Sequence, residues 1–86
     1  MKIPKKINLL GTEYQVVRKI LRDDRARIEY DTKKILIHSK IKSQEQLEFE
    51  FYHELGHFLL RFSNLYPPEK ESFCNIFARY LMCIFS

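Results

Sequence analysis

The chain of 86 residues has no long apolar run, no low-complexity tract and no internal repeat. Because a membrane span needs roughly 18 continuous apolar residues, a transmembrane helix is not expected. The opening stretch, MKIPKKINLLGTEY, has a proline and charges where a signal peptide would need an apolar core. A chain this short is expected to form one domain, residues 1–86. Because neither a membrane span nor a signal peptide is expected, the protein is predicted to be cytoplasmic.

Cysteine is scarce, with only Cys74 and Cys83 present. The two lie in one expected helix at a spacing that places them about 180° apart around its axis, so they should not pair with each other. Free thiols suit a reducing compartment. Because the chain has no CxxC spacing, both cysteines are predicted to be poor candidates for metal binding or redox chemistry.

A strong charge bias is also absent. The net charge is +4, and lysine and arginine are concentrated in the first 42 residues. No nucleic-acid-binding motif or aromatic stacking platform accompanies that charge, so we expect a solvated sheet face and consider nucleic-acid binding unlikely. The composition, 45% hydrophobic and 30% charged, is that of a folded protein rather than a disordered one.

The first half of the chain, residues 1–42, is predicted to consist mainly of strands. Residues 5–10 and 14–21 flank GTE as a hairpin, with Gly11 available for a positive φ. After the charged break RDDR, the stretch ARIEY alternates small or apolar residues with charged ones, DTK forms a turn and KILIHS supplies another strand. We expect a small antiparallel sheet of three to four strands.

The second half is predicted to form two helices. Ser43 opens SQEQ as a cap, and the helix that follows occupies residues 43–62. The stretch SNLYPP breaks it, and one of its prolines takes the first position of a second helix, residues 67–86. The fold class is therefore α+β: a small sheet covered by two helices, the first of which is buried between the sheet and its partner helix.

The stretch FYHELGHFLL carries the chemistry. On a helical wheel His57 lies about 40° from His53, so both imidazoles project from one face within reach of a single Zn²⁺. Glu54, about 100° round, is not placed as a ligand but is placed to hold a metal-bound water. Gly56 would let a neighbouring backbone approach closely. A separate apolar stripe is predicted to face the sheet, formed by Phe51, Leu55, Phe58 and Phe62.

A catalytic zinc site has three protein ligands and leaves one position for water, so a third ligand is needed. Glu71 is the best candidate, because its distance from His57 allows one more turn, a loop and the start of an antiparallel helix. Asn75, one turn further on, is placed to hydrogen-bond a ligating histidine. Glu69 is the rival ligand, but it points about 200° away when Glu71 faces inward. The alternative to a zinc site is an apolar helix that carries two partly exposed histidines.

Together, HELGH and ESFCNIFARYLM resemble the ImmA/IrrE-type metallopeptidases and the single-domain minigluzincins, in which an HExxH helix is followed by a helix reading roughly E-x-x-x-N-x-F-A-x-x-L-M. The upstream IEYDTKKILIHS is similar to the strand and turn that precede the active-site helix there. The resemblance implies a minimal zincin-like domain in which His53, His57 and Glu71 bind one Zn²⁺ and Glu54 is the catalytic carboxylate. The positions that match the second motif are Glu71, Asn75, Phe77, Ala78, Leu81 and Met82.

We therefore expect a zinc-dependent endopeptidase of the gluzincin type, in which Glu54 takes a proton from zinc-bound water and passes it to the leaving amine. A peptide or protein substrate could add a strand to the sheet edge. His38 and Tyr66 are candidate oxyanion donors, although each is more readily explained as structural.

The alternative is a zinc-stabilised, catalytically silent or latent module that binds another protein. The apolar final helix motivates this alternative, because a partner, a homodimer or self-inhibition would cover its exposed face. An equally simple explanation is that this helix is central to a small core.

Overall fold

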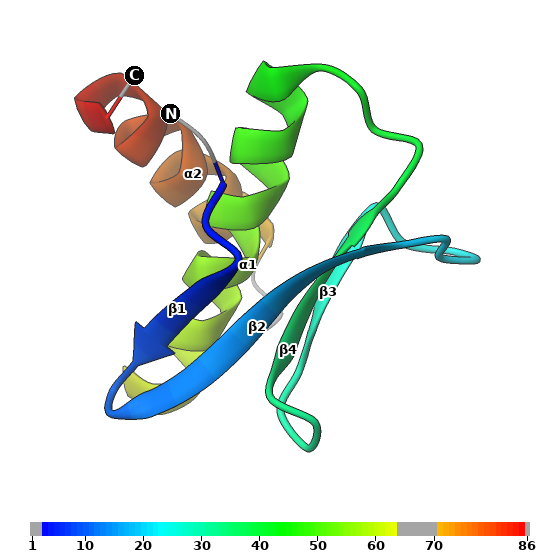
Figure 1. Cartoon of the computed structure of the whole chain (residues 1–86). Coiled ribbons are helices and arrows are strands. Elements are labelled where there is room, and N and C mark those ends of the chain that lie inside the picture. Colours follow the sequence, from blue (N-terminus) through cyan, green and yellow to red (C-terminus); the bar gives the residue numbers. More distant parts are fainter. Residues whose placement is uncertain (1–2, 64–70, 86) are drawn as a thin grey trace.

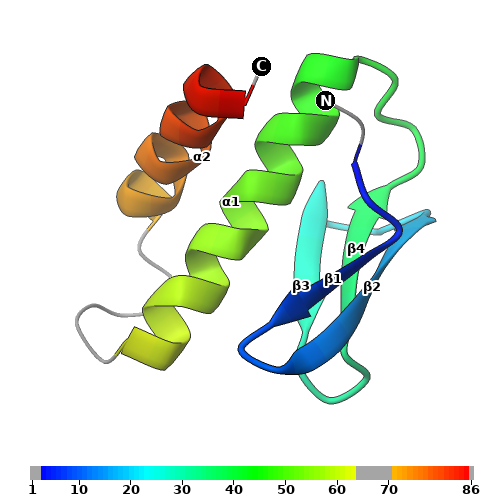
Figure 2. The same cartoon turned by 60° about the vertical axis from the view of Figure 1, so that its left-hand side comes forward.

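The computed structural model describes residues 3–63 and 71–85 and has the predicted α+β class. A four-stranded sheet is followed by two helices, and α1 lies between the sheet and α2 (Figures 1 and 2). The elements are β1 (Lys6–Leu9), β2 (Thr12–Lys19), β3 (Ala26–Glu29), β4 (Lys34–His38), α1 (Gln44–Ser63) and α2 (Glu71–Phe85). The predicted start of the second helix at residue 67 lies outside the described residues.

The sheet is mixed, which corrects the expectation of an antiparallel sheet. Its order is β1-β2-β4-β3, and the central pair, β2 with β4, is parallel. The chain leaves β2, forms β3 at the far edge and returns so that β4 lies between them. Strand β4 occupies a central position because Ile35, Leu36 and Ile37 form a continuous apolar run, and these three side chains are 2% exposed or less.

The β1–β2 hairpin has the predicted glycine turn in a tighter form. Leu9 pairs with Thr12, so the loop contains only Leu10 and Gly11, with φ values of 51° and 88°. Two positive φ values are typical of the two-residue turns that match strand twist. The Gly11 N–H donates to Asn8 Oδ1 at 2.9 Å, which further fixes the turn.

Helix α1 begins where the sequence predicts. The Ser43 hydroxyl accepts a hydrogen bond from the Gln46 N–H at 3.2 Å, and the Ser43 carbonyl accepts one from the Leu47 N–H at 3.0 Å. This is the arrangement of an N-cap serine, which satisfies otherwise unpaired amide groups of the first turn. The helix ends at Ser63, one residue beyond the prediction.

The connection from β4 to α1 is held by Arg18 of β2. Its Nη2 donates to the carbonyl oxygens of His38, Ser39 and Ile41 at 3.3, 3.0 and 2.6 Å. A single guanidinium therefore fixes the path of the chain immediately before the Ser43 cap. This contact joins β2 to the segment that leads into α1.

The predicted apolar stripe of α1 is largely confirmed. Phe51 and Phe58 belong to the core and are 1% and 7% exposed, and Leu55 is half-buried against it. Phe62 is 53% exposed, so the stripe stops one turn before the end of the helix. The Phe62 ring instead packs against the rings of Phe58 and Tyr30, with centroids 4.6 and 6.1 Å away.

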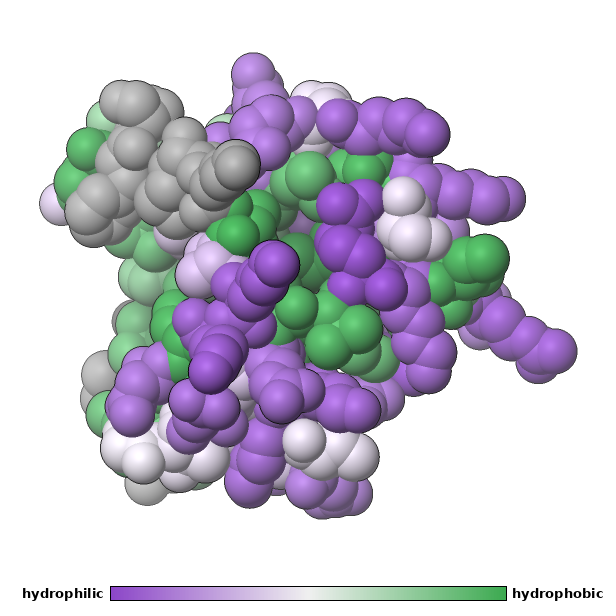
Figure 3. All heavy atoms as spheres, viewed as in Figure 1, coloured by the Kyte–Doolittle hydropathy of each residue, from purple (hydrophilic) through white to green (hydrophobic). Residues whose placement is uncertain are grey.

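The surface in the view of Figure 1 is largely hydrophilic, with apolar side chains between the polar ones (Figure 3). Along β1 and β2 the exposed side chains include both signs of charge, as a solvated sheet face requires. Neither described helix combines the length and the apolar character needed to cross a membrane.

Helix α2 runs back alongside α1 (Figure 2) and makes a close approach at Gly56. A Cβ added at Gly56 would lie 3.2 Å from the Cys74 Cα and 3.3 Å from the Phe77 ring. The predicted role of this glycine, to let a neighbouring backbone come close, is confirmed. The partner backbone is that of α2 at Cys74.

Gly56→Val is expected to lower the free energy of unfolding by about 1–3 kcal/mol, because the added side chain would meet the α2 backbone and overpack the interface. Denaturant unfolding measures the change. Leu59→Val is the control, since it places the same β-branched residue at an exposed position of α1. A Gly56→Val variant as stable as this control would contradict the argument.

Candidate metal centre and cleft

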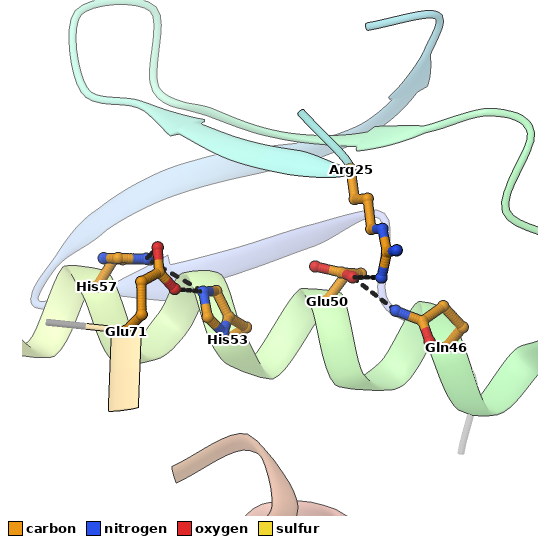
Figure 4. A network of polar contacts seen from close by, with 6 residues as sticks. All are labelled: Arg25, Gln46, Glu50, His53, His57 and Glu71. Atoms are coloured by element: carbon orange, nitrogen blue, oxygen red, sulfur yellow. Dashed lines mark hydrogen bonds and ion pairs between the residues drawn. The ribbon is translucent and has the colours of Figure 1, made fainter. Parts of the chain in front are cut away.

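His53 and His57 project from one face of α1, as their spacing predicts. Their Nε2 atoms are 3.2 Å apart. Both side chains are mostly buried, with exposed fractions of 11% and 17%. The two rings therefore present a pair of nitrogen donors toward a common point (Figure 4).

Glu71, the first residue of α2, completes the constellation predicted from the sequence. Its Oε2 lies 2.6 Å from His53 Nε2, and its Oε1 lies 3.4 Å from His57 Nε2 (Figure 4). Its side chain is 64% exposed, so the carboxylate reaches the histidines from the solvent side. Glu69, the rival ligand, lies outside the described residues.

The donor set and its spacing fit a divalent ion of the zinc type. Imidazole nitrogens and a carboxylate are the ligands found in catalytic zinc sites. Two nitrogens at about 2.0–2.1 Å from one tetrahedral ion lie about 3.3 Å apart. The observed Nε2 separation of 3.2 Å is close to that value. The histidine pair is therefore already spaced for a shared ion.

Cys74 also lies at this site, which corrects the expectation that neither cysteine suits a metal. One ligand atom from each of His53, His57 and Cys74 lies within 4.8 Å of the other two. The expectation considered only cysteine spacing along the chain, whereas this contact crosses between two helices. One feature of the sequence could have indicated that Cys74 lies at the site. It follows Glu71 by three residues, which places both on the same face of α2. As predicted, Cys74 and Cys83 are not paired.

The Cys74 thiol is fully buried. Burial, followed by the nearby carboxylates of Glu71 and Glu54, raises its pKa to about 11. In the metal-free protein this thiol is therefore protonated at neutral pH.

Glu54, the predicted catalytic carboxylate, is a buried acid beside the histidines. It is only 6% exposed. Burial raises its pKa to about 7, the histidine at position 57 acts in the opposite direction, and the carboxylates of Glu50 and Glu71 raise it further. A carboxyl group with this pKa is able both to accept and to release a proton near neutrality.

A second buried carboxylate lies one turn before Glu54. Glu50 is 7% exposed, accepts a hydrogen bond from Gln46 Nε2 at 2.6 Å and lies 4.0 Å from Arg25 Nη1 (Figure 4). A buried carboxylate needs such partners, because an unpaired one would be strongly destabilising. Glu50 thus remains a fixed acidic neighbour of Glu54.

These groups open into a cleft of about 340 Å³ between the helices and the sheet. Its helical side is formed by Glu54, His57, Arg61 and Glu71, and its sheet side includes β3 and Tyr30. Because β3 is an edge strand of the described sheet, the cleft borders a strand edge. The Arg61 guanidinium lies 4.1 Å from the centre of the Tyr30 ring, which ties the two walls together.

His38, one of the two candidate oxyanion donors from the sequence, does not line this cleft. His38 lines a separate depression of about 430 Å³ with Arg25 and Lys40, and its Nδ1 accepts a hydrogen bond from the Lys40 N–H at 3.1 Å. Tyr66 lies outside the described residues. Sequence reasoning did not single out Tyr30 and Arg61, whose side chains do line the cleft.

The predicted hydrogen bond from Asn75 to a ligating histidine is not formed at His53. The His53 Nδ1 is buried and has no hydrogen-bond partner among the described residues, and Asn75 is exposed. Metal-ligating histidines usually donate their second ring N–H to an acceptor. At His53 the neighbouring group is instead the Phe49 ring, with the ring centres 5.9 Å apart.

The raised pKa of Glu54 predicts how the stability of the metal-free protein varies with pH. The carboxyl group has a pKa of 4.5 in the unfolded reference and about 7 in the folded protein. Its stabilising contribution is therefore fully present below pH 4.5 and is lost as the pH rises through 7. At about 1.4 kcal/mol per pKa unit, the loss is of the order of 3–4 kcal/mol.

Denaturant unfolding with a chelator across this pH range measures the effect. Glu54→Gln should flatten the decline, because the amide does not titrate. Glu45→Gln, at an exposed position of the same helix, should retain it. An undiminished decline in Glu54→Gln would assign the pH dependence to other groups.

The chain is similar to a known peptidase family. The family model of peptidase M78, described as an IrrE N-terminal-like domain, matches residues 10–83, which include all of β2, β3, β4 and α1. This confirms the resemblance seen in the HELGH and ESFCNIFARYLM motifs. No curated protein and no solved structure matches the chain.

Proposed function

Because the chain belongs to the IrrE N-terminal-like family of peptidases, we propose that it is a zinc-dependent endopeptidase of the gluzincin type. In this proposal His53, His57 and Glu71 bind one zinc ion and Glu54 is the catalytic carboxylate. The observation that supports it best is the position of Glu71, whose carboxylate reaches from α2 to both Nε2 atoms of the α1 histidines.

When bound, zinc supplies Lewis acidity, which polarises a peptide carbonyl and lowers the pKa of a water molecule. The chain supplies the proton transfer. A carboxylate oxygen of Glu54 accepts a proton from the attacking water and later donates it to the leaving nitrogen. Because Glu54 is buried, bulk water does not compete for its carboxylate.

The substrate class we propose is an extended segment of an unfolded protein. Strand β3 lies at the sheet edge and borders the cleft that contains Glu54 and His57. A peptide could pair with that edge through main-chain hydrogen bonds, which require no particular side-chain sequence. Tyr30 and Arg61 would then lie along the bound segment, because both line the same cleft.

A second candidate function is a latent or catalytically silent module that keeps zinc and binds another protein or a second copy of the chain. It is favoured by apolar side chains that α2 exposes at a four-residue spacing. These are Ile76, Tyr80 and Ile84, with exposed fractions of 69%, 63% and 52%. Zinc binding by wild type without cleavage of any unfolded substrate would favour this second function.

Glu54→Gln is expected to lower the rate of cleavage of an unfolded protein substrate by at least about 100-fold, since general acid–base catalysis of this kind contributes 10²–10⁴-fold. Zinc content should stay at one ion per chain, because Glu54 is not proposed as a ligand. Glu45→Gln is the matched control on α1. Undiminished cleavage by Glu54→Gln would remove this residue from the mechanism.

The proposed ligands are tested by metal analysis without any substrate. His57→Ala and Glu71→Ala should each lower the amount of zinc retained after dialysis. His38→Ala should leave it unchanged, because this histidine lies in a separate depression. Equal zinc content in all three variants and wild type would place the metal elsewhere or show that binding is nonspecific.

A further inference from the structure

The proposed mechanism gives no role to Cys74, although its sulfur lies near the two histidines. We propose that Cys74 is a fourth protein ligand of the metal centre, and that its sulfur occupies the coordination position that catalysis would need for water. The ion would then be held in a latent form. This inference rests on the proposed zinc site and extends it.

The distances place the sulfur within reach of the ion. A tetrahedral zinc ion lies about 2.3 Å from sulfur and about 2.0–2.1 Å from nitrogen, which separates the two ligand atoms by about 3.5 Å. In the structure the ligand atoms of Cys74, His53 and His57 all lie within 4.8 Å of one another. Bringing the sulfur to ligand distance from an ion held by the two histidines therefore requires the separation between sulfur and histidine nitrogen to shorten by about 1.3 Å at most.

The packing of α2 keeps the sulfur at this place. Cys74 has no exposed surface, and its Cα would lie 3.2 Å from a Cβ at Gly56. The backbone of Cys74 is therefore in close contact with α1 at Gly56, one residue before His57. Glu71, by contrast, is 64% exposed. The two α2 side chains thus reach the histidine pair from different sides, Cys74 from the interior and Glu71 from the solvent.

The chemistry of the donor set favours coordination by this thiol. Sulfur is a preferred ligand of zinc, and a coordinating thiol loses its proton. Four protein ligands are typical of structural zinc sites, whereas catalytic sites retain an open position. A centre with two histidines, one carboxylate and one thiolate would therefore be closed to water for as long as the sulfur remains bound.

X-ray absorption spectroscopy of the zinc-loaded chain tests the inference directly. Wild type should show one sulfur neighbour at about 2.3 Å beside nitrogen or oxygen neighbours at about 2.0–2.1 Å. Cys74→Ala should lose the sulfur neighbour and retain zinc through the other three ligands. Cys83→Ser is the matched control, because Cys83 is exposed and lies away from the histidines around α2.

Cleavage of an unfolded protein substrate supplies a second readout. Cys74→Ala should cut at least about tenfold faster than wild type, since an open position restores water access. If Cys74→Ala does not fold, the spectra of wild type and Cys83→Ser still test the inference. A sulfur neighbour that is present in both proteins cannot come from Cys83, so it comes either from Cys74 or from a methionine. In that case Cys74→Ser distinguishes the cysteine from a methionine.

The outcomes separate this inference from the proposed function. Zinc bound without sulfur in wild type would overturn the inference and leave the peptidase proposal intact. Equal cleavage rates for wild type and Cys74→Ala would overturn the proposed latency. Failure of wild type to bind zinc would overturn both proposals.

Discussion

The site depends on one steric constraint, the absence of a side chain at Gly56. The two helices meet there with the Cys74 backbone at 3.2 Å from the position of a Cβ. With the helices this close, a carboxylate from the first residue of α2 reaches Nε2 atoms on α1. The helix that bears the histidines is in turn positioned by the sheet, through β3, β4 and the Arg18 contact to the chain before Ser43.

Burial gives the same helix its chemical character. Helix α1 lies between two layers, so the polar residues on its inner faces have little access to solvent. These are Glu48, Glu50, His53 and Glu54. The consequence differs between these residues. Glu50 has Gln46 and Arg25 as partners, while burial raises the pKa of Glu54 to about 7. One location therefore provides both a carboxylate held by partner side chains and a carboxyl group able to exchange protons near neutrality.

Local patterns made much of the fold and part of the site predictable. The i, i+4 spacing of His53 and His57 determines that they share a helix face, and Ser43 has the chemistry of an N-cap. The α+β class followed from the change of period between the halves of the chain. The convergence of Glu71 on the histidines was also expected, because the second motif places a carboxylate at the start of the next helix.

What could not be predicted depends on contacts between distant segments. The sequence of neither strand determines that β2 and β4 pair in parallel. This pairing follows from the position in which the Ile35–Leu36–Ile37 run becomes buried. The place of Cys74 follows from the crossing of two helices, so a search for cysteine spacing along the chain missed it. Tyr30 and Arg61 belong to the cleft only because β3 and α1 lie side by side.

The parallel pair also has a consequence for the order of folding. Both hairpins of the sheet join neighbours in sequence, whereas β2 and β4 pair residues that are 19 positions apart, such as Gln15 with Lys34. Non-local pairing of this kind forms more slowly than local hairpins. The two halves of the sheet should therefore form first as separate units, and their union should be the late step. Because Arg18 of β2 holds the chain before Ser43 and Tyr14 of β2 packs on Phe58 of α1, the helix that bears the histidines should reach its final position only when the two halves have joined.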